Sequence, residues 1–136
     1  MPPAPGPRVR SDPRVAPSPH RDDHGDMPFI DPSTLPDLGP KPGWHGRFFH
    51  SEHMTFAYYE LEAGASLHVH SHPNEEVWNI VVGQLELTVG GETRTLGAGC
   101  AAVVPAGTTH SVSAKVPCRA IVVDHPVRHE VAGVKI

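Results

Sequence analysis

The feature that most constrains this chain is the segment of residues 64–83, GASLHVHSHPNEEVWNIVVG, which places closely spaced histidines ahead of a carboxylate. Alternate side chains of a β-strand point to one face, so we expect His68, His70 and His72 to share a face. The Pro-Asn pair that follows is typical of a turn, and a turn here would return Glu76 towards the histidines on the next strand. Imidazole nitrogens and a carboxylate oxygen that converge in this way predict a metal site.

A second segment, residues 99–114 (GCAAVVPAGTTHSVSA), supplies a further ligand. Its short apolar run at 101–104 is typical of a buried strand. A Pro-Ala-Gly turn ends that run, and His110 begins the next strand. We therefore predict a ligand set of three histidines and one carboxylate, namely His70, His72, Glu76 and His110.

These segments resemble the two sequence motifs of the cupin superfamily. The first motif is a glycine, five residues, His-x-His, three or four residues, Glu, six residues and a glycine, and it is met at Gly64, His70, His72, Glu76 and Gly83. The second is a glycine, five residues, Pro-x-Gly, two residues, His, three residues and Asn. Its matches are Gly99, Pro105, Gly107 and His110. Ala114 stands where the motif has its asparagine, and that asparagine is not a metal ligand in the family.

The resemblance covers roughly residues 43–127 and implies an all-β protein, a cupin jelly-roll β-barrel or double-stranded β-helix. It also implies a homodimer, which fits a strand at 76–82 that is apolar on both faces and whose outward side chains need cover. Alternation places Glu76, Trp78, Ile80 and Val82 on one face of that strand. Gly90-Gly91 predicts a two-residue hairpin turn of the primed type. The expected strands are residues 44–49, 53–61, 67–72, 76–82, 84–89, 92–96, 100–104, 110–113 and 119–124.

Proline divides the chain into two parts. Twelve of the 16 prolines fall in residues 1–42, which we interpret as a flexible, proline-rich tail, and residues 43–136 form the barrel domain. A His/Asp cluster at 20–26 is either a loose metal site or a solvated linker. Apolar residues return at 29–38, and this piece is expected to lie along the barrel wall or against a neighbouring subunit.

Composition narrows the partners and the compartment. The formal charge is −4 and no long basic run occurs, which argues against nucleic acid and membrane as main partners and leaves a small-molecule substrate. No stretch approaches the ~18 apolar residues of a membrane helix, and the N-terminus lacks the apolar centre of a secretory signal, so cytoplasm is the default expectation. Cys100 and Cys118 lie in no metal-binding spacing and are interpreted as thiols, with a disulfide as the lesser alternative.

The ligand set does not select its ion. Fe²⁺, Mn²⁺, Ni²⁺ and Zn²⁺ all accept three nitrogens and a carboxylate, and we expect one such ion per chain. Four protein ligands leave two positions of an octahedron open for water or substrate, so chemistry at the ion is possible.

Several other residues are candidates for the site. His68 could act as acid and base near neutral pH, or could only support a ligand. Tyr58 and Trp78 have the size to form an apolar pocket wall, although such residues are more often core. Small cupins that open or isomerise unsaturated uronate sugars end in a similar apolar strand, aspartate, proline and arginine, here Asp124, Pro126 and Arg128.

Asp124 is therefore a candidate general base or partner of a ligand histidine, although alternation alone does not decide whether it faces inward. Arg128 and Arg47 are candidates for binding a substrate carboxylate. The main hypothesis is a metal-dependent isomerase or lyase that moves a proton on a small organic acid or sugar acid. The alternatives are an iron-dependent dioxygenase and a non-catalytic, metal-stabilised binding module.

Overall fold

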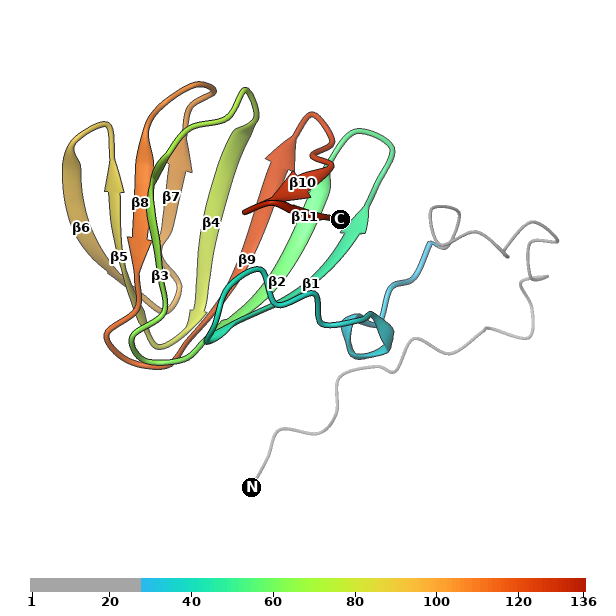
Figure 1. Cartoon of the computed structure of the whole chain (residues 1–136), viewed down its shortest axis with the longest axis horizontal. Helices are drawn as coiled ribbons and strands as arrows, with labels where there is room; N and C mark the ends of the chain where they lie inside the picture. The colour runs from blue at the N-terminus through green and yellow to red at the C-terminus, as the bar shows by residue number, and fades with distance from the viewer. Residues whose placement is uncertain (1–27) are drawn as a thin grey trace, which may run out of the picture.

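The computed structural model describes residues 28–136, and this part of the chain is built almost entirely from β-strands (Figure 1). Its one helical element is a single 3₁₀ turn ahead of the strands. The elements are η2 (Pro32–Thr34), β1 (Trp44–His50), β2 (Thr55–Leu61), β3 (Ser66–His70), β4 (Glu75–Val82), β5 (Gln84–Val89), β6 (Glu92–Gly97), β7 (Ala101–Val104), β8 (His110–Ser113), β9 (Cys118–His125), β10 (Glu130–Val131) and β11 (Val134–Lys135). The expectation of an all-β protein is confirmed.

The strands form two antiparallel sheets that pack face to face. One sheet has the order β1-β2-β9-β4-β7 and the other the order β3-β8-β5-β6, while β10 and β11 form a separate hairpin. Neighbours such as β2 and β9 are far apart in the sequence, which is the connectivity of a jelly roll. The core between the sheets includes Trp44, Trp78, Leu85, Leu87 and Val112, each at most 2% exposed.

Alternation along β9 decides which face of that strand is inward. Cys118, Ala120, Val122 and Asp124 are all buried, so Asp124 points into the barrel at the end of the apolar row. In β4 the predicted inward face holds for Glu76, Trp78 and Ile80. The expectation for Val82 is wrong: the register against β9 shifts between Ile80 and Val82, and the alternation ends there, with Val81 and Val82 both exposed at 49% and 51%.

Two glycine positions fix connections that a side chain would obstruct. Gly90 and Gly91 have φ of 56° and 85°, which confirms the predicted primed turn between β5 and β6. Gly83 has φ of 79°, and a Cβ atom there would overlap with the carbonyl oxygen of Pro117. Only glycine therefore fits between β4 and β5.

The segment before β1 lies along the barrel wall, one of the two expected positions. The amide of Leu38 donates to the carbonyl of Gly46 at 2.9 Å, and the carboxylate of Asp37 accepts from the Gly46 amide at 3.0 Å. Arg47 donates to the carbonyl of Leu35. The rest of the tail prediction, residues 1–27 with the His/Asp cluster at 20–26, lies outside the described residues.

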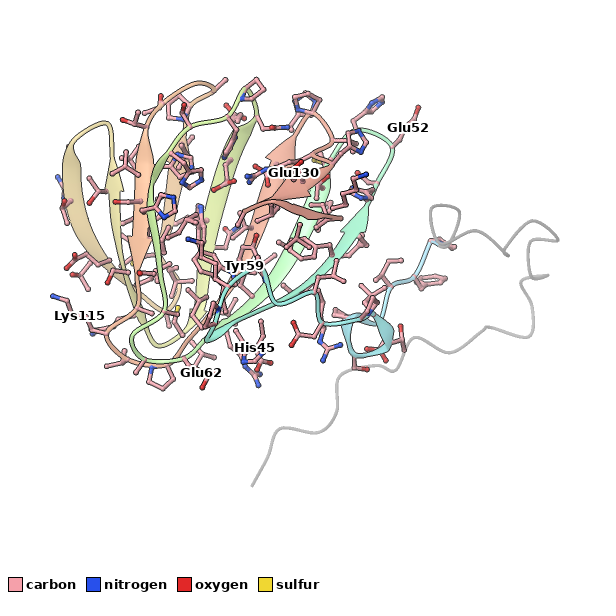
Figure 2. The ribbon with its side chains drawn as sticks, in the orientation of Figure 1. His45, Glu52, Tyr59, Glu62, Lys115 and Glu130 are labelled. Carbon is pink, nitrogen blue, oxygen red and sulfur yellow. The ribbon has the colours of Figure 1, made fainter. Side chains whose placement is uncertain are left out.

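An exposed ion-pair cluster reinforces this contact at one end of the barrel, where Figure 2 shows His45 and Glu62 together. The imidazole of His45 binds Asp37 through Nδ1 at 2.8 Å and Glu62 through Nε2 at 2.9 Å. Hydrogen bonding to Asp37, and then to Glu62, raises the pKa of His45, and the same bond to His45 lowers the pKa of Asp37.

Both cysteines are free thiols, as expected, with Cys100 exposed and Cys118 buried. Nothing helical in residues 28–136 has the length and apolar character needed to span a bilayer.

Candidate metal centre

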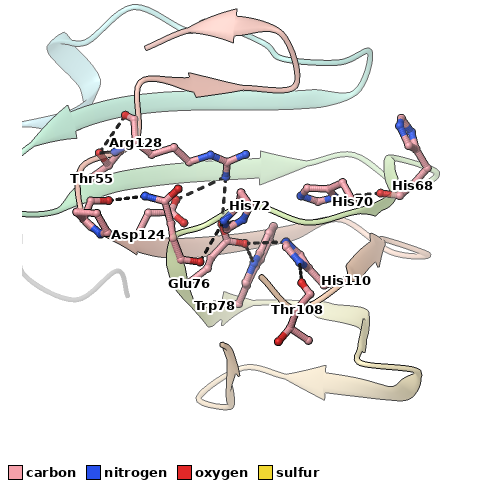
Figure 3. A network of polar contacts seen from close by, with 12 residues as sticks. Thr55, His68, His70, His72, Glu76, Trp78, Thr108, His110, Asp124 and Arg128 are labelled. Atoms are coloured by element: carbon pink, nitrogen blue, oxygen red, sulfur yellow. Dashed lines mark hydrogen bonds and ion pairs between the residues drawn. The ribbon is translucent and has the colours of Figure 1, made fainter. Parts of the chain in front are cut away.

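Three imidazoles meet where β3, β4 and β8 approach one another inside the barrel (Figure 3). His70 ends β3, His72 lies in the turn that follows, and His110 begins β8. One ring nitrogen from each lies within 4.8 Å of the others, and the ring centroids of His70 and His110 are 4.1 Å apart. The two sequence segments that predicted the ligands therefore do bring their histidines together.

Each of these histidines is oriented by the main chain. The Nδ1 atoms of His70, His72 and His110 donate to the carbonyls of His68 (3.0 Å), Asn74 (3.1 Å) and Thr108 (2.9 Å). With Nδ1 protonated, the lone pair of a neutral imidazole is on Nε2. The Nε2 atoms of His72 and His110 are buried and have no hydrogen-bond partner among residues 28–136. Buried, unpaired acceptors of this kind are costly, and a cation would satisfy them, so the residues fit a metal ion.

Glu76 completes the predicted ligand set. Its side chain is buried, with Oε2 at 3.1 Å from His72 Nε2 and Oε1 at 3.5 Å from His110 Nε2. The carboxylate also accepts hydrogen bonds from the Trp78 indole and from Arg128 Nη1, the latter at 3.1 Å. Burial acts to raise the pKa of Glu76, but contacts with His110 and His72 outweigh it and hold the pKa well below the ordinary value. Glu76 is thus an anion at neutral pH.

Asp124 lies beside Glu76, directly opposite it in the pairing of β4 with β9. It is 2% exposed, and its Oδ1 atom has no hydrogen-bond partner among residues 28–136. Burial raises the pKa of Asp124, the hydrogen bond and charge of Glu76 raise it further, and Arg128 acts in the opposite direction. Glu76 and Asp124, with His72, form a second group of potential ligand atoms within 4.8 Å of one another. The pair holds one carboxylate ionised and the other protonated.

Arg128 reaches this carboxylate pair from the segment between β9 and β10. Its Nη1 atom lies 3.1 Å from Glu76 Oε2 and 3.7 Å from Asp124 Oδ2. The remaining guanidinium nitrogens make no hydrogen bond or ion pair with residues 28–136. Arg128 can therefore balance the charge of Glu76 and still bind an external anion.

Thr55 is a residue of this site that sequence reasoning missed. It is 1% exposed at the start of β2, opposite Asp124 in the strand pairing. Its hydroxyl accepts from the Arg128 amide at 2.8 Å, donates to the Arg128 carbonyl at 3.2 Å and binds His50 Nδ1 at 2.7 Å. The backbone of Arg128 is thereby held to the barrel wall. Arg128 is 73 residues away, so no local signal could have identified this role.

The expectation that His68 shares the face of His70 is wrong. The pairing of β3 with β8 is shifted between Leu67 and His70, and this irregularity reverses the alternation. The His68 side chain is exposed, its ring contacts Lys41 at 3.1 Å, and it points away from the other histidines (Figure 3). His68 contributes its carbonyl to His70 and not its imidazole to the site.

The proposed pocket residues lie elsewhere. Trp78 is a core residue beneath Glu76, to which it donates, and not an exposed wall. Tyr58 and Arg47 face the outside of the five-stranded sheet, where they line a groove of about 580 Å³ together with Ile121 and Arg119. The structure therefore does not bring Tyr58 or Arg47 to the imidazoles, because consecutive residues of β2 alternate and it is Tyr59 that is buried.

Comparisons with known proteins agree with this architecture. The model of the family described as Cupin domain matches residues 57–124, half of the chain, including all four predicted ligands. An uncharacterized protein of Streptomyces coelicolor, SCO3923, is 34% identical over 68 residues, which are 50% of this chain. That alignment spans 65% of the relative's length, less than two thirds of it.

Two solved structures share the fold. An RmlC-like cupin from Shewanella frigidimarina NCIMB 400 superposes with a TM-score of 0.72 at 20% identity, over 78% of this chain and 96% of that one. KdgF from Halomonas sp. has a TM-score of 0.66 at 27% identity, over 74% of this chain and 93% of that one. With the family match, the barrel and the two histidine motifs in agreement, this chain belongs to the cupin family.

Proposed function

We propose that this cupin is a metal-dependent isomerase or lyase that moves a proton on a small organic acid or sugar acid. His70, His72, His110 and Glu76 would hold one divalent transition ion per chain, either Fe²⁺, Mn²⁺, Ni²⁺ or Zn²⁺. An ion bound there would supply a Lewis acid that polarises a substrate carbonyl or enediol. The observation that carries the proposal is Asp124, a buried carboxyl beside Glu76 and His72 whose Oδ1 has no hydrogen-bond partner among residues 28–136.

Asp124 is suited to move the proton. The pKa of Asp124 is raised from that of an ordinary aspartate, so the carboxyl can carry a proton at neutral pH. A general acid or base is most effective when its pKa is close to the working pH. Glu76 cannot take this role, because it is ionised and its oxygens already accept from Trp78 and Arg128. Asp124 would therefore donate or accept a proton at Oδ1.

Arg128 is suited to bind the acid group of the substrate. Its guanidinium has nitrogens left for an external carboxylate, and such pairs are often bidentate. The resemblance of Asp124, Pro126 and Arg128 to the ending of cupins that open or isomerise unsaturated uronate sugars favours a sugar acid as substrate. The 27% identical KdgF is the neighbour whose substrates we would assay first.

The test begins with elemental analysis of protein purified without an affinity tag, followed by turnover of candidate uronates under anaerobic conditions. We expect about one ion per chain and turnover without oxygen, and Asp124→Asn should abolish turnover while retaining the metal. Glu52→Gln, whose side chain is exposed in the loop between β1 and β2, is the control.

Substrate-dependent oxygen uptake by the iron-loaded form would instead identify a dioxygenase. Metal retention with ligand binding and no turnover would identify a binding module. Full activity of Asp124→Asn would refute the role of Asp124.

We also propose that the barrel domain, residues 43–136, forms a homodimer through the outer face of its five-stranded sheet. One apolar residue from each strand lies in a register-matched row across that face: Val103, Val77, Val123, Phe56 and Phe49. A row of this kind exposed on a monomer would need cover. Sedimentation equilibrium should give twice the chain mass of 14.6 kDa, and a monomer at all concentrations would refute the pairing.

A further inference from the structure

Asn74 occupies the segment between β3 and β4, two residues after the ligand candidate His72. It is 6% exposed, although a polar residue in a turn is normally solvated. Sequence reasoning gave it only a role in the turn. A role in the turn alone does not explain why Asn74 is buried next to the candidate metal site.

The two polar ends of Asn74 contact two different parts of the site. Its main-chain carbonyl accepts from Nδ1 of His72 at 3.1 Å, the bond that leaves the His72 lone pair on Nε2. Its side-chain Nδ2 donates to the carbonyl of Pro126 at 2.6 Å. Pro126 lies two residues after Asp124 and two before Arg128, so this bond reaches the segment that carries both groups.

The same turn is also held from its other side. The carbonyl of His72 accepts from the amide of Gly107, in the turn that precedes His110. The turn of His72 is therefore fixed between the segment leading to His110 and the segment leading to Arg128. Asn74 supplies the second of these two attachments, and no other side chain in residues 28–136 hydrogen-bonds the Pro126 carbonyl.

We propose that Asn74 is a positioning residue that fixes the imidazole of His72 and the segment of Arg128 relative to each other. The side chain must donate, because the Pro126 carbonyl can only accept. Aspartate has the same shape but offers an acceptor, so Asn74→Asp places two acceptors 2.6 Å apart and should separate the two segments. This inference rests on the metal centre proposed above.

The experiment compares Asn74→Asp and Asn74→Ala with Asn79→Ala. Asn79, in β4, is a matched control, because its Nδ2 also donates to a main-chain carbonyl, that of Ile121 at 3.1 Å, but on the outer face of the sheet. Alanine removes this bond without adding a charge to the proposed dimer face. Dissociation constants for Zn²⁺ and Co²⁺ are measured by chelator competition, and the Co²⁺ absorption spectrum reports the geometry at the ion. Hydrogen exchange of the amides of residues 127–129 is followed in metal-free protein.

We expect Asn74→Asp and Asn74→Ala to weaken metal binding by about 10- to 100-fold, the range found when a partner that orients a metal ligand is removed. Both variants should alter the Co²⁺ spectrum and speed exchange at residues 127–129, whereas Asn79→Ala should do neither. Two Asn74 variants are used so that, if one of them fails to fold, the other still tests the proposal.

Each remaining outcome overturns the inference at a different point. Wild-type metal affinity and exchange in both Asn74 variants would show that Asn74 positions neither group. Weaker metal binding with unchanged exchange would show a local effect on His72 without the link to Arg128. If the wild-type protein binds neither ion, the metal centre itself fails, while exchange in metal-free protein still reports whether Asn74 holds the Arg128 segment.

Discussion

Thr55→Val tests how the arginine segment is attached to the barrel. Valine keeps the branched shape that packs in β2 and removes only the hydroxyl, which is 1% exposed in the native protein. Three polar groups lose their partner: the amide and carbonyl of Arg128, at 2.8 Å and 3.2 Å, and Nδ1 of His50, at 2.7 Å.

The magnitude follows from these contacts. Each intramolecular hydrogen bond contributes about 0.5–1.5 kcal/mol net, so three lost bonds sum to roughly 1.5–4.5 kcal/mol. The buried methyl that replaces the hydroxyl returns about 0.8 kcal/mol. We therefore expect Thr55→Val to lower the free energy of unfolding by about 1–4 kcal/mol.

Urea unfolding of metal-free protein measures this loss. Trp44 and Trp78, the two tryptophans of the chain, are both 2% exposed, so their fluorescence reports the barrel core. With an m-value of about 1–3 kcal/mol per molar urea, the midpoint should fall by roughly 1 M. The matched control is Thr95→Val, on exposed β6, whose hydroxyl makes no hydrogen bond with residues 28–136; it should stay within about 0.5 kcal/mol of wild type. A Thr55→Val protein as stable as that control would refute the reasoning.

Three further predictions concern separate parts of the molecule. His72→Ala should lose most bound metal and with it the metal-dependent gain in the free energy of unfolding, which is about 2.7 kcal/mol at a metal concentration 100 times Kd. His68→Ala should keep both, and equal metal content in the two variants would contradict the site. The pKa of His45 is raised in the folded state, so its protonation contributes stability that is fully present below the unfolded pKa of 6.5 and is lost as pH rises through the folded pKa. In urea titrations, wild type should therefore exceed His45→Gln in stability by more near pH 6 than near pH 9. A difference that does not depend on pH would exclude the ion pair as its cause. Gly83→Ala should lower the free energy of unfolding by about 3 kcal/mol or more, or prevent folding, because the positive φ strains the alanine backbone and its Cβ overlaps with the Pro117 carbonyl. A circular dichroism melt like that of wild type would argue against the close approach of Gly83 to Pro117.

The arrangement of the candidate ligands was predictable because it depends on short sequence spacings. His70, His72 and Glu76 lie within one strand, turn and strand, and His110 follows a Pro-x-Gly turn at a fixed offset. Strand alternation also predicted that Asp124 shares a face with Ala120 and Val122. Which face is inward required the second sheet, because both faces of β9 are largely apolar.

The errors have a common physical origin in departures from ideal strands. His68 and Val82 were placed by a period of two, and in each case a register shift interrupted the alternation, with no proline or glycine between the shifted residues to indicate it. Tyr58 is a different case: β2 carries aromatic residues on both faces, so side-chain size could not identify the inward one. Thr55 and Asn74 act through contacts over 73 and 52 residues, which depend on the completed barrel.

The three imidazoles of the metal centre take their orientation from main-chain oxygens, those of residues 68, 74 and 108. A carbonyl is present whatever side chain a position carries, so substitution at residues 68 and 108 leaves the acceptors for His70 and His110 in place. The surface around those two histidines can therefore change in sequence without first having to preserve a supporting side chain. On this scaffold, variation of the residues around His70 and His110 is compatible with a constant arrangement of the three imidazoles.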